Sequence, residues 1–281
     1  MEIRVAIFGM GRFGRALACA LAQAGHEPER IGGRGKPHAQ GRKLAPEPQD
    51  MLRGLPPETL VVLAVQDDRI PALAAQFAAL PGAGAHSFVH TSGASGPGAL
   101  KALADIGAQT GVFHVLQSLP PEKGERRIAG SYAALAGPPP LVERLRQVGH
   151  AIGVHPVELK PDQWGPYHAA AVLASNALLG LLDIANELLR DAGVPSAPHL
   201  LLPLVQGTLL NANELDLTAA LTGPVVRGDT GTIKKHLELL QGQSRDAYIA
   251  GLRAVLGLAR RSGRAPADKL DEIARLIDQA K

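Results

Sequence analysis

A long uncharged segment in the second half of the chain constrains the fold more than any other feature. It runs from Trp164 to Arg190, WGPYHAAAVLASNALLGLLDIANELLR, and carries no formal charge from Gln163 to Leu182. Pro166 suits the first turn of a helix and Gly193 suits its end. At a rise of about 1.5 Å per residue the helix would span roughly 40 Å, which is longer than one small core. The sequence therefore predicts a buried helical rod around which a domain is built.

Polar side chains interrupt this helix along one face. At about 100° per residue they fall within one arc of roughly 80°. The members of this stripe are His168, Ser175, Asn176, Asp183 and Asn186. Hydrogen-bonding groups in this number argue against a membrane span and require partners. A bound small molecule and a polar seam between two subunits are both compatible with the pattern.

A glycine-rich turn lies between a short β-rich run, Arg4 to Phe8, and a helical pattern that ends at Gly25. The first glycine permits a sharp turn, the second leaves room for a pyrophosphate, and the third lets helix and strand approach closely. The N-terminus of the helix supplies free N–H groups and positive potential for a phosphate. The pattern favours dinucleotide binding over a purely structural turn. The predicted cofactor-binding residues of this turn are Gly9, Met10, Gly11, Arg12, Phe13 and Gly14.

Further apolar runs alternate with helical patterns, which predicts a parallel sheet. Strands are expected at 59–65, 87–90, 111–116 and 132–136. Val65 and Gln66 end the first of these runs and Ser92 follows the second, so we expect all three to face the cofactor. For Ser92, an ordinary helix-capping turn is an equal alternative. His114 lies within the third run, where a satisfied core histidine is the expected role unless the ligand points there.

The second strand is poorly defined, because Pro28 and Glu29 interrupt it. Glu29 has the offset of an acidic ribose ligand, but the following turn offers Arg34 and Lys36, which suit a phosphate better. The sequence therefore predicts NADP in preference to NAD. Solvated loop charges are the alternative for the two basic residues.

The pattern of turns changes after Pro120, and the LKPDQWGP segment marks a domain boundary. We expect an α/β chain with an N-terminal Rossmann-type dinucleotide-binding domain, residues 1–160. An all-α domain built on the long helix follows at residues 161–281. In this second domain Arg227 lies in a Gly-flanked turn and suits a bidentate grip on a carboxylate, with an internal pair to Asp229 as the alternative.

Composition narrows the classes of function. The chain has 281 residues, 46% of them hydrophobic, and a formal net charge of +3. Its dispersed basic residues make nucleic-acid binding an unfavoured function, and we expect neither a metal site nor a membrane partner. A single cysteine, Cys19, excludes an internal disulfide framework and fits a reducing compartment. No secretory signal is visible at the N-terminus, so we expect a cytoplasmic protein.

With these motifs placed, the chain to about Arg260 resembles a bacterial family of Rossmann-like NADP oxidoreductases with a C-terminal helical domain of unassigned function. The matching segments are GMGRFG, AVQDD, HTSG, YHAAAVLASN, LLPLVQGTL and LTGPVVRGD. The resemblance implies a fold shared with the 6-phosphogluconate, β-hydroxyacid, ketopantoate and pyrroline-carboxylate reductase group, in which the helical domain commonly dimerises. Val172 stands where the hydroxyacid and ketopantoate enzymes usually carry a catalytic lysine, and Val115 stands where this family more often has proline.

The sequence thus predicts an NADPH-dependent reductase, a homodimer, that acts on a small oxo acid or imino acid with a ketopantoate-like compound favoured. His168 is the expected proton donor, because an imidazole exchanges protons near neutral pH. Ser175 and Asn176 are expected to bind the carbonyl oxygen, Arg227 a carboxylate, and Ser92 to order the nicotinamide side. The alternative function is a non-catalytic NADP-binding sensor or assembly protein, which the missing lysine favours.

Overall fold

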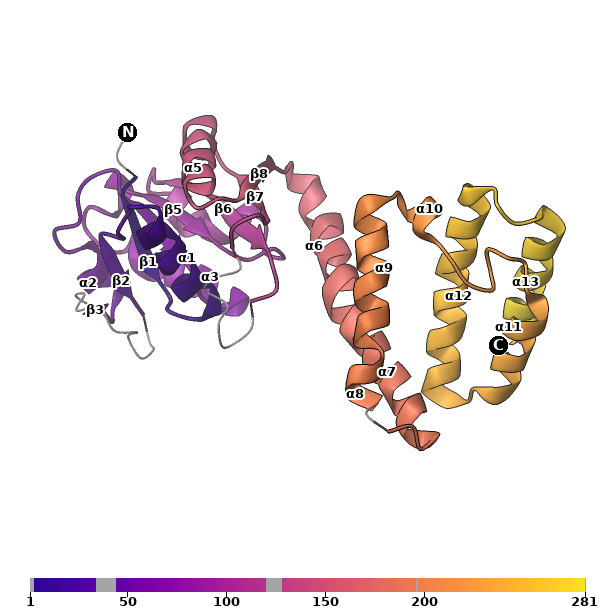
Figure 1. The fold of residues 1–281 in the computed structure, drawn as a ribbon. Helices are drawn as coiled ribbons and strands as arrows, with labels where there is room; N and C mark the ends of the chain where they lie inside the picture. Colours follow the sequence, from indigo (N-terminus) through magenta and orange to yellow (C-terminus); the bar gives the residue numbers. More distant parts are fainter. Residues whose placement is uncertain (1–2, 34–43, 120–127, 196, 281) are drawn as a thin grey trace. The chain divides into compact units, whose positions relative to one another are not determined.

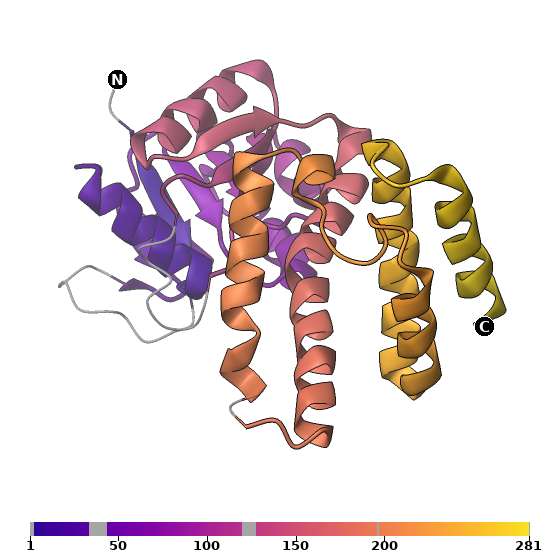
Figure 2. The same cartoon turned by 45° about the vertical axis from the view of Figure 1, so that its right-hand side comes forward.

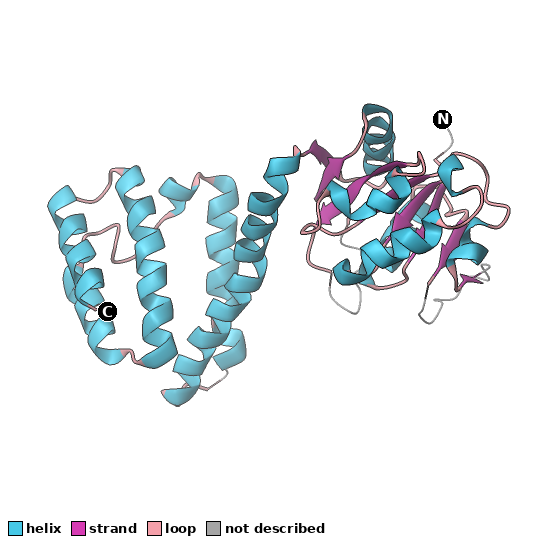
Figure 3. Cartoon of the chain, turned by 180° about the vertical axis from the view of Figure 1, so that it is seen from behind, coloured by secondary structure: helices cyan, strands magenta, loops and turns pink. Residues whose placement is uncertain are grey.

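A computed structural model of the chain describes residues 3–33, 44–119, 128–195 and 197–280. It divides into two compact units, Met1–Leu173 and Ala174–Lys281. Strands are confined to the first unit, and the second is helical throughout its described residues (Figure 3). The predicted fold class, a Rossmann-type α/β domain followed by an all-α region, is confirmed.

The first unit is built on one sheet with the strand order β3-β2-β1-β4-β5-β6-β7-β8 (Figure 1). Adjacent strands are parallel except for β6 and β7. The order reverses between β1 and β4, which is the topological switch point where open α/β sheets bind ligands. The strands are β1 (Val5–Phe8), β2 (Arg30–Gly32), β3 (Leu44–Ala45), β4 (Leu60–Leu63), β5 (Ser87–His90), β6 (Gln109–Leu116), β7 (Tyr132–Ala136) and β8 (His155–Glu158).

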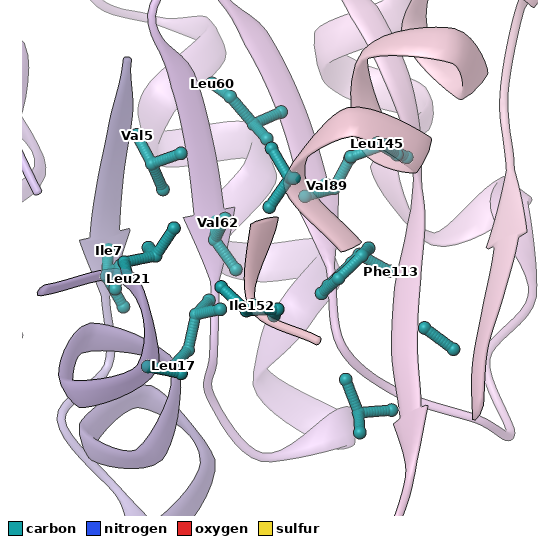
Figure 4. Close-up of a cluster of buried hydrophobic side chains, with 14 of the residues drawn as sticks. Val5, Ile7, Leu17, Leu21, Leu60, Val62, Val89, Phe113, Leu145 and Ile152 are labelled. Carbon is teal, nitrogen blue, oxygen red and sulfur yellow. The ribbon is translucent and has the colours of Figure 1, made fainter. Parts of the chain in front are cut away.

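Apolar side chains cover both faces of this sheet, which is why its central strands are buried along their whole length. One cluster packs Leu17 and Leu21 of α1 and Leu145 of α5 on the face that Val5 and Val62 line (Figure 4). The other packs α2, α3 and α4 against the opposite face. Besides α6 (Trp164–Val172), which begins the long helix, the α-helices of this unit are α1 (Arg12–Gln23), α2 (Pro48–Leu52), α3 (Ile70–Ala78), α4 (Lys101–Ala104) and α5 (Pro139–Ala151).

The long helix forms as predicted but is not regular. It comprises α6 (Trp164–Val172), a π-helical segment (Leu173–Ala177) and α7 (Leu178–Asp191). Gly193, at φ +69, ends it as expected, because a left-handed residue lets the chain turn away. The wider turn of the π-helix shifts every later residue around the axis. The single polar stripe expected for a regular α-helix is therefore wrong beyond the π segment.

The predicted burial of this helix is also wrong for the single chain. Trp164 is 3% exposed, packed on Val112 and Ala134 of the sheet, but none of the residues of α7 is buried. Several of its apolar side chains are exposed within the chain, and Leu179 is the most exposed of them at 64%. By length and composition alone, Pro161–Asp191 is the one helix of the described chain that could cross a membrane. The boundary predicted at residue 160 marks the start of this helix, whereas the compact units divide inside it.

The second unit has its own core, to which Ile233, Leu252 and Ile273 contribute from three different helices. In this core α12 and α13 lie side by side (Figure 2). Asp229 caps α11 by accepting hydrogen bonds from the Thr232 backbone N–H at 3.0 Å and hydroxyl at 2.7 Å. Besides α7, the helices of this unit are α8 (Ala197–Leu200), α9 (Leu202–Glu214), α10 (Leu217–Ala220), α11 (Thr230–Leu239), α12 (Gly242–Ser262) and α13 (Ala267–Gln279).

The aromatic stack beneath the sheet gives a direct test of the core. Phe77 is fully buried between Phe8 and Phe88, with ring centroids 5.4 and 5.5 Å away. We expect Phe77→Ala to lower the free energy of unfolding by about 3–5 kcal/mol, because it leaves a cavity that the stack cannot fill. Urea denaturation measures the loss, and Tyr132→Ala is the control, because Tyr132 is 57% exposed. Equal losses in the two variants would contradict this description of the core.

Candidate functional site

The glycine turn after β1 is shaped by close backbone contacts. Gly9 has φ +114, and a Cβ there would lie 2.2 Å from the carbonyl oxygen of Ala64. A Cβ at Gly14 would lie 1.8 Å from the carbonyl oxygen of Gly9. A Cβ at Gly11, in contrast, would meet nothing within 4 Å. Gly9 and Gly14 are thus required by the packing of β1 and α1, while Gly11 borders open space, as the sequence predicts for a phosphate-binding turn.

A cavity of about 470 Å³ opens beside this turn, at the carboxyl ends of β1 and β4. The structure brings five of the predicted cofactor-binding residues to its wall: Gly9, Met10, Gly11, Val65 and Gln66. Sequence reasoning missed other residues of the same wall, among them Glu47, Arg69, Leu73 and Gln76. Arg69 closely follows the predicted end of the strand at 59–65, and this position in the chain was the available signal. For Glu47 and Gln76 the sequence contained no such signal.

These residues fit a dinucleotide. No side chain of the described residues caps the N-terminus of α1, where Gly11 is the N-cap, so the first N–H groups of that helix are available to a phosphate. The open space at Gly11 lies directly beside them. Apolar side chains of Val65 and Leu73 and the polar ends of Gln66 and Gln76 line the remainder, which suits an adenosine group.

The other predicted cofactor residues are placed differently. Arg12 is exposed and donates a hydrogen bond to the Leu119 carbonyl oxygen at 3.5 Å, and Phe13 packs against the core of the sheet. Arg34 and Lys36 lie outside the described residues. Glu29 is wrong as a ribose ligand, because it precedes β2 and its N–H binds the Val5 carbonyl oxygen, at the amino end of the sheet.

The loop after β5 uses its own polar groups. The Ser92 hydroxyl accepts hydrogen bonds from the Ala94 and Ser95 N–H groups and donates one to the Ser95 hydroxyl at 2.9 Å. This arrangement is an ordinary turn held by the Ser92 hydroxyl, but Ser92 does not cap a helix, because Gly96 is the N-cap of the following 3-10 helix, Pro97–Leu100. His90, fully buried, donates from Nε2 to the Gly96 carbonyl oxygen and accepts at Nδ1 from the Ser92 N–H. Both bonds fit a neutral ring, and burial lowers the pKa of His90 further.

Next to this loop, two imidazoles and a phenol form a cluster. Nδ1 of His114, on β6, lies 2.8 Å from the Tyr167 hydroxyl oxygen on α6. A Cβ at Gly93 would lie 2.8 Å from His114 Nε2 and 2.9 Å from His168 Nδ1, so both rings converge on this residue. Nδ1 of His168 is buried without a hydrogen-bond partner among the described residues, and such an atom requires a ligand or water.

Electrostatics keep His114 neutral. Desolvation by burial lowers its pKa to about 4, the charge of His168 adds to this effect, and Asp67 opposes it. Burial also raises the pKa of the Tyr167 hydroxyl to about 12. At neutral pH the cluster therefore holds an uncharged imidazole hydrogen-bonded to a protonated phenol. The sequence had singled out His168 and weighed His114, but Tyr167 was missed because its neighbour on β6 is far away in the chain.

The remaining predicted catalytic residues belong to the second unit. Ser175 and Asn176 lie in the π-helical segment, and Arg227 is exposed in the turn before α11. Hydrogen bonds to Thr232 are the main cause of the lowered pKa of Asp229, and the charge of Arg227 contributes less. The carboxylate is thus held by the helix N-terminus rather than mainly by Arg227.

Comparisons with known proteins agree with this architecture. Residues 1–115 match a Rossmann-like domain, and residues 131–254 match a domain of unknown function, DUF2520. The chain therefore carries a Rossmann-like domain followed by a DUF2520 domain. No curated protein sequence matches it.

Solved structures share the fold at low sequence identity. A Bacteroides fragilis protein assigned as an NADP oxidoreductase is 20% identical with a TM-score of 0.70, covering 93% of this chain and 98% of its own. An imine reductase of Streptomyces aurantiacus is 21% identical with a TM-score of 0.59 and coverages of 99% and 95%. Pyrroline carboxylate reductase of Plasmodium falciparum with NADP bound is 13% identical with a TM-score of 0.58 and coverages of 92% and 98%.

The neutral state of His114 predicts a pH dependence of stability. Because its pKa is lowered from 6.5 to about 4 on folding, the unfolded chain binds more protons between these values. Stability from this group is present above pH 6.5 and is lost as the pH falls towards 4, by at most about 3 kcal/mol. Urea denaturation should show a steeper decline for the native chain than for His114→Gln over this range. Parallel declines would contradict the assignment, since His90 and the carboxylates are common to both proteins.

Proposed function

We propose that this chain is an NADPH-dependent reductase that transfers a hydride to a small compound with a C=O or C=N bond. The observation that carries the proposal is that a cavity and a cluster of polar side chains lie along the same edge of the sheet. The cavity lies at the glycine turn after β1. The cluster, formed by the protonated Tyr167 phenol and the neutral His114 imidazole, lies near the carboxyl ends of β5 and β6. In an open α/β sheet both positions face the ligand.

The cofactor would be held by the glycine turn and by the residues that end β4. The N–H groups of α1 and the space at Gly11 would take the pyrophosphate, and Val65 and Gln66 would border the adenosine side. Arg69 in the cavity wall, together with the basic residues Arg34 and Lys36, supports NADP over NAD. When bound, the dihydronicotinamide supplies the hydride. The residues of the chain must then orient the acceptor and provide a proton.

The acceptor would meet side chains from the long helix. His168, with the Tyr167–His114 pair beside it, forms the proton-exchanging cluster. From the sequence pattern alone, Ser175 and Asn176 are proposed to bind the reacting oxygen or nitrogen, and Arg227 a carboxylate. An oxo acid or imino acid fits these groups, with a ketopantoate-like compound as the first candidate. The imine and pyrroline carboxylate reductases among the structural neighbours support C=N compounds equally.

A non-catalytic NADP-binding sensor is the second candidate function. Val172 supports it, because an apolar side chain occupies the position where related reductases carry a lysine ammonium. A sensor would bind the cofactor and leave it unchanged with every acceptor. The buried Nδ1 atom of His168, which has no hydrogen-bond partner among the described residues, favours a reductase. Such an atom marks a place where an acceptor could bind in addition to the cofactor.

Substitution of Gly11 tests the cofactor site. Gly11→Leu should fold normally, because Gly11 has φ −70 and open space at its Cβ, but its side chain would fill the place of the pyrophosphate. We expect NADPH binding, measured by calorimetry, to weaken about 100-fold, roughly 2.7 kcal/mol. NADPH oxidation by a panel of oxo acids and imino acids, followed by absorbance, should be lost in parallel.

Gly98→Leu is the matched control, since Gly98 is exposed, has open space at its Cβ and does not line the cavity. It should bind NADPH as the native chain does. Unchanged binding by Gly11→Leu would place the cofactor elsewhere. Tight NADPH binding by the native chain without oxidation by any acceptor would favour the sensor.

We further propose that the protein works as a homodimer in the cytoplasm, where the free Cys19 stays reduced. Leucines on α7 and α9 carry the dimer proposal, among them Leu179, Leu204 and Leu209, which are 64%, 68% and 55% exposed. Exposed apolar surface of this extent marks an association surface. A second copy of the same helices suits it better than lipid, because α7 also carries Asp183, Glu187 and Arg190.

A double substitution tests this association. Leu179→Lys with Leu204→Lys should turn the dimer into a monomer in light scattering, because two charges would be desolvated in the interface of each protomer. Leu239→Lys, at a leucine 76% exposed on α11, should stay dimeric. A native chain that is monomeric at micromolar concentration, or that requires detergent to remain in solution, would contradict the proposal.

A further inference from the structure

We infer that Tyr167 donates the proton that completes the reduction, and that His114 stabilises the phenolate which this donation leaves. The inference rests on the proposed reductase function and assigns one atom, the Tyr167 hydroxyl oxygen, within the cluster at the end of β5 and β6. The polar pattern of the long helix had indicated His168 for this role. Contacts made across the sheet point to its neighbour instead.

Two aromatic neighbours hold the Tyr167 ring in place. Trp164, buried against the sheet, meets it edge-on with a centroid separation of 5.8 Å, and His114 meets it edge-on at 5.5 Å. The hydrogen bond to His114 Nδ1 at 2.8 Å then fixes the hydroxyl group itself. A proton donor held by packing and by a hydrogen bond needs little reorganisation when the reaction occurs.

The Tyr167–His114 pair lies at the end of the sheet where an acceptor would bind. His90 ends β5 and pairs with Val112 of β6, so His114 lies beyond this pair at the carboxyl end of β5. Gly93 follows β5, and the absence of its side chain lets the His114 and His168 rings approach the same point. Ligands of open α/β sheets bind outside these strand ends. The phenol is therefore on the reacting side of the sheet.

Protonation states distinguish Tyr167 from His114 as the donor. The groups that face His114 are Asp67, His90, His168 and Tyr167, and burial dominates over all of them. With a pKa of about 4, the imidazolium form of His114 amounts to about one molecule in a thousand at neutral pH. Tyr167, with its pKa raised to about 12, retains its proton. When His114 carries its hydrogen on Nδ1 it donates to the phenol oxygen, which leaves the phenol O–H free to donate to an acceptor.

The hydride and the proton go to different atoms of the acceptor. The hydride adds to the carbon of a C=O or neutral C=N bond, whose π electrons move to the oxygen or nitrogen. That atom takes the proton from the Tyr167 hydroxyl, forming a new O–H or N–H bond as the phenol O–H bond breaks. The phenolate accepts the hydrogen bond from His114 Nδ1–H until a proton from water restores the phenol. The cofactor is oxidised and the acceptor is reduced by two electrons.

This assignment separates two classes of acceptor. A neutral ketone or imine needs the proton, whereas a quaternary iminium such as N-methyl-1-pyrrolinium becomes a neutral amine on hydride addition alone. Tyr167→Phe should therefore lower kcat for the neutral acceptor about 100-fold. The same variant should keep its rate with N-methyl-1-pyrrolinium, and its KM for NADPH should not change.

The chain contains a matched control. Tyr248 forms the same pair with His236, with the phenol oxygen 2.8 Å from Nδ1 and a centroid separation of 5.5 Å, in the core of the second unit. Tyr248→Phe removes an equivalent hydroxyl that belongs to the core of the second unit, and it should leave both rates unchanged. Tyr167→Phe with equal losses on both acceptors, or with no loss on either, would overturn the inference.

A measurement without turnover completes the test. In the cofactor-free protein, the Nδ1–H proton of His114 should appear in the imidazole NMR spectrum as a slowly exchanging resonance, and Tyr167→Phe should remove it. Its persistence in the variant would overturn the role of His114. If the native chain oxidises NADPH with no acceptor of either class, the proposed reductase function fails. If only the quaternary iminium is reduced, the reductase function stands and the assignment of Tyr167 fails.

Discussion

The approach of α1 to the end of β1 is the contact on which the rest of the first unit depends. Gly14 lies against the carbonyl oxygen of Gly9, and Gly9 in turn lies against Ala64 at the end of β4. No side chain fits at either position, so the turn lets two neighbouring strands and one helix approach one another through backbone contacts. The N–H groups of α1 consequently point into the space beside Gly11. Packing and phosphate recognition are thus two results of one arrangement.

The rest of the site lies along the same edge of the sheet as this turn. Parallel strands bring their carboxyl ends to one edge, which places the residues after β4 and β5 and those on β6 in a row. The start of the long helix adds Tyr167 and His168 to that row through the contact of Trp164 with the sheet. Burial then determines the charge state, because it removes the charge from His114 and keeps the proton on Tyr167. The protonation states of the cluster therefore follow from the burial of ordinary residues.

Local patterns in the sequence predicted the parts of this structure that depend on neighbours in the chain. The glycine turn, the strands at 87–90 and 132–136, and the end of the long helix at Gly193 follow from such patterns. Parts that depend on distant contacts did not. The pair of His114 and Tyr167 joins positions 53 residues apart, and no periodicity reveals it. Burial of α7 was predicted wrongly for a related reason, since its apolar composition indicates a need for cover but does not show that the chain itself covers the helix only in part. The shift of the polar stripe by the π-helix had no signal in the sequence that we could identify.

The central claim is that one edge of the sheet binds NADPH at the Gly11 turn and presents the Tyr167 hydroxyl to the acceptor. A crystal structure with NADP and a non-reacting acceptor analogue tests it most directly. The account predicts the pyrophosphate against the N–H groups at the start of α1, the nicotinamide ring beside Gly93, and the reacting oxygen or nitrogen of the analogue within hydrogen-bond distance of Tyr167. A pyrophosphate bound away from Gly11, or a nicotinamide ring with its reacting carbon remote from Gly93 and Tyr167, would contradict the account.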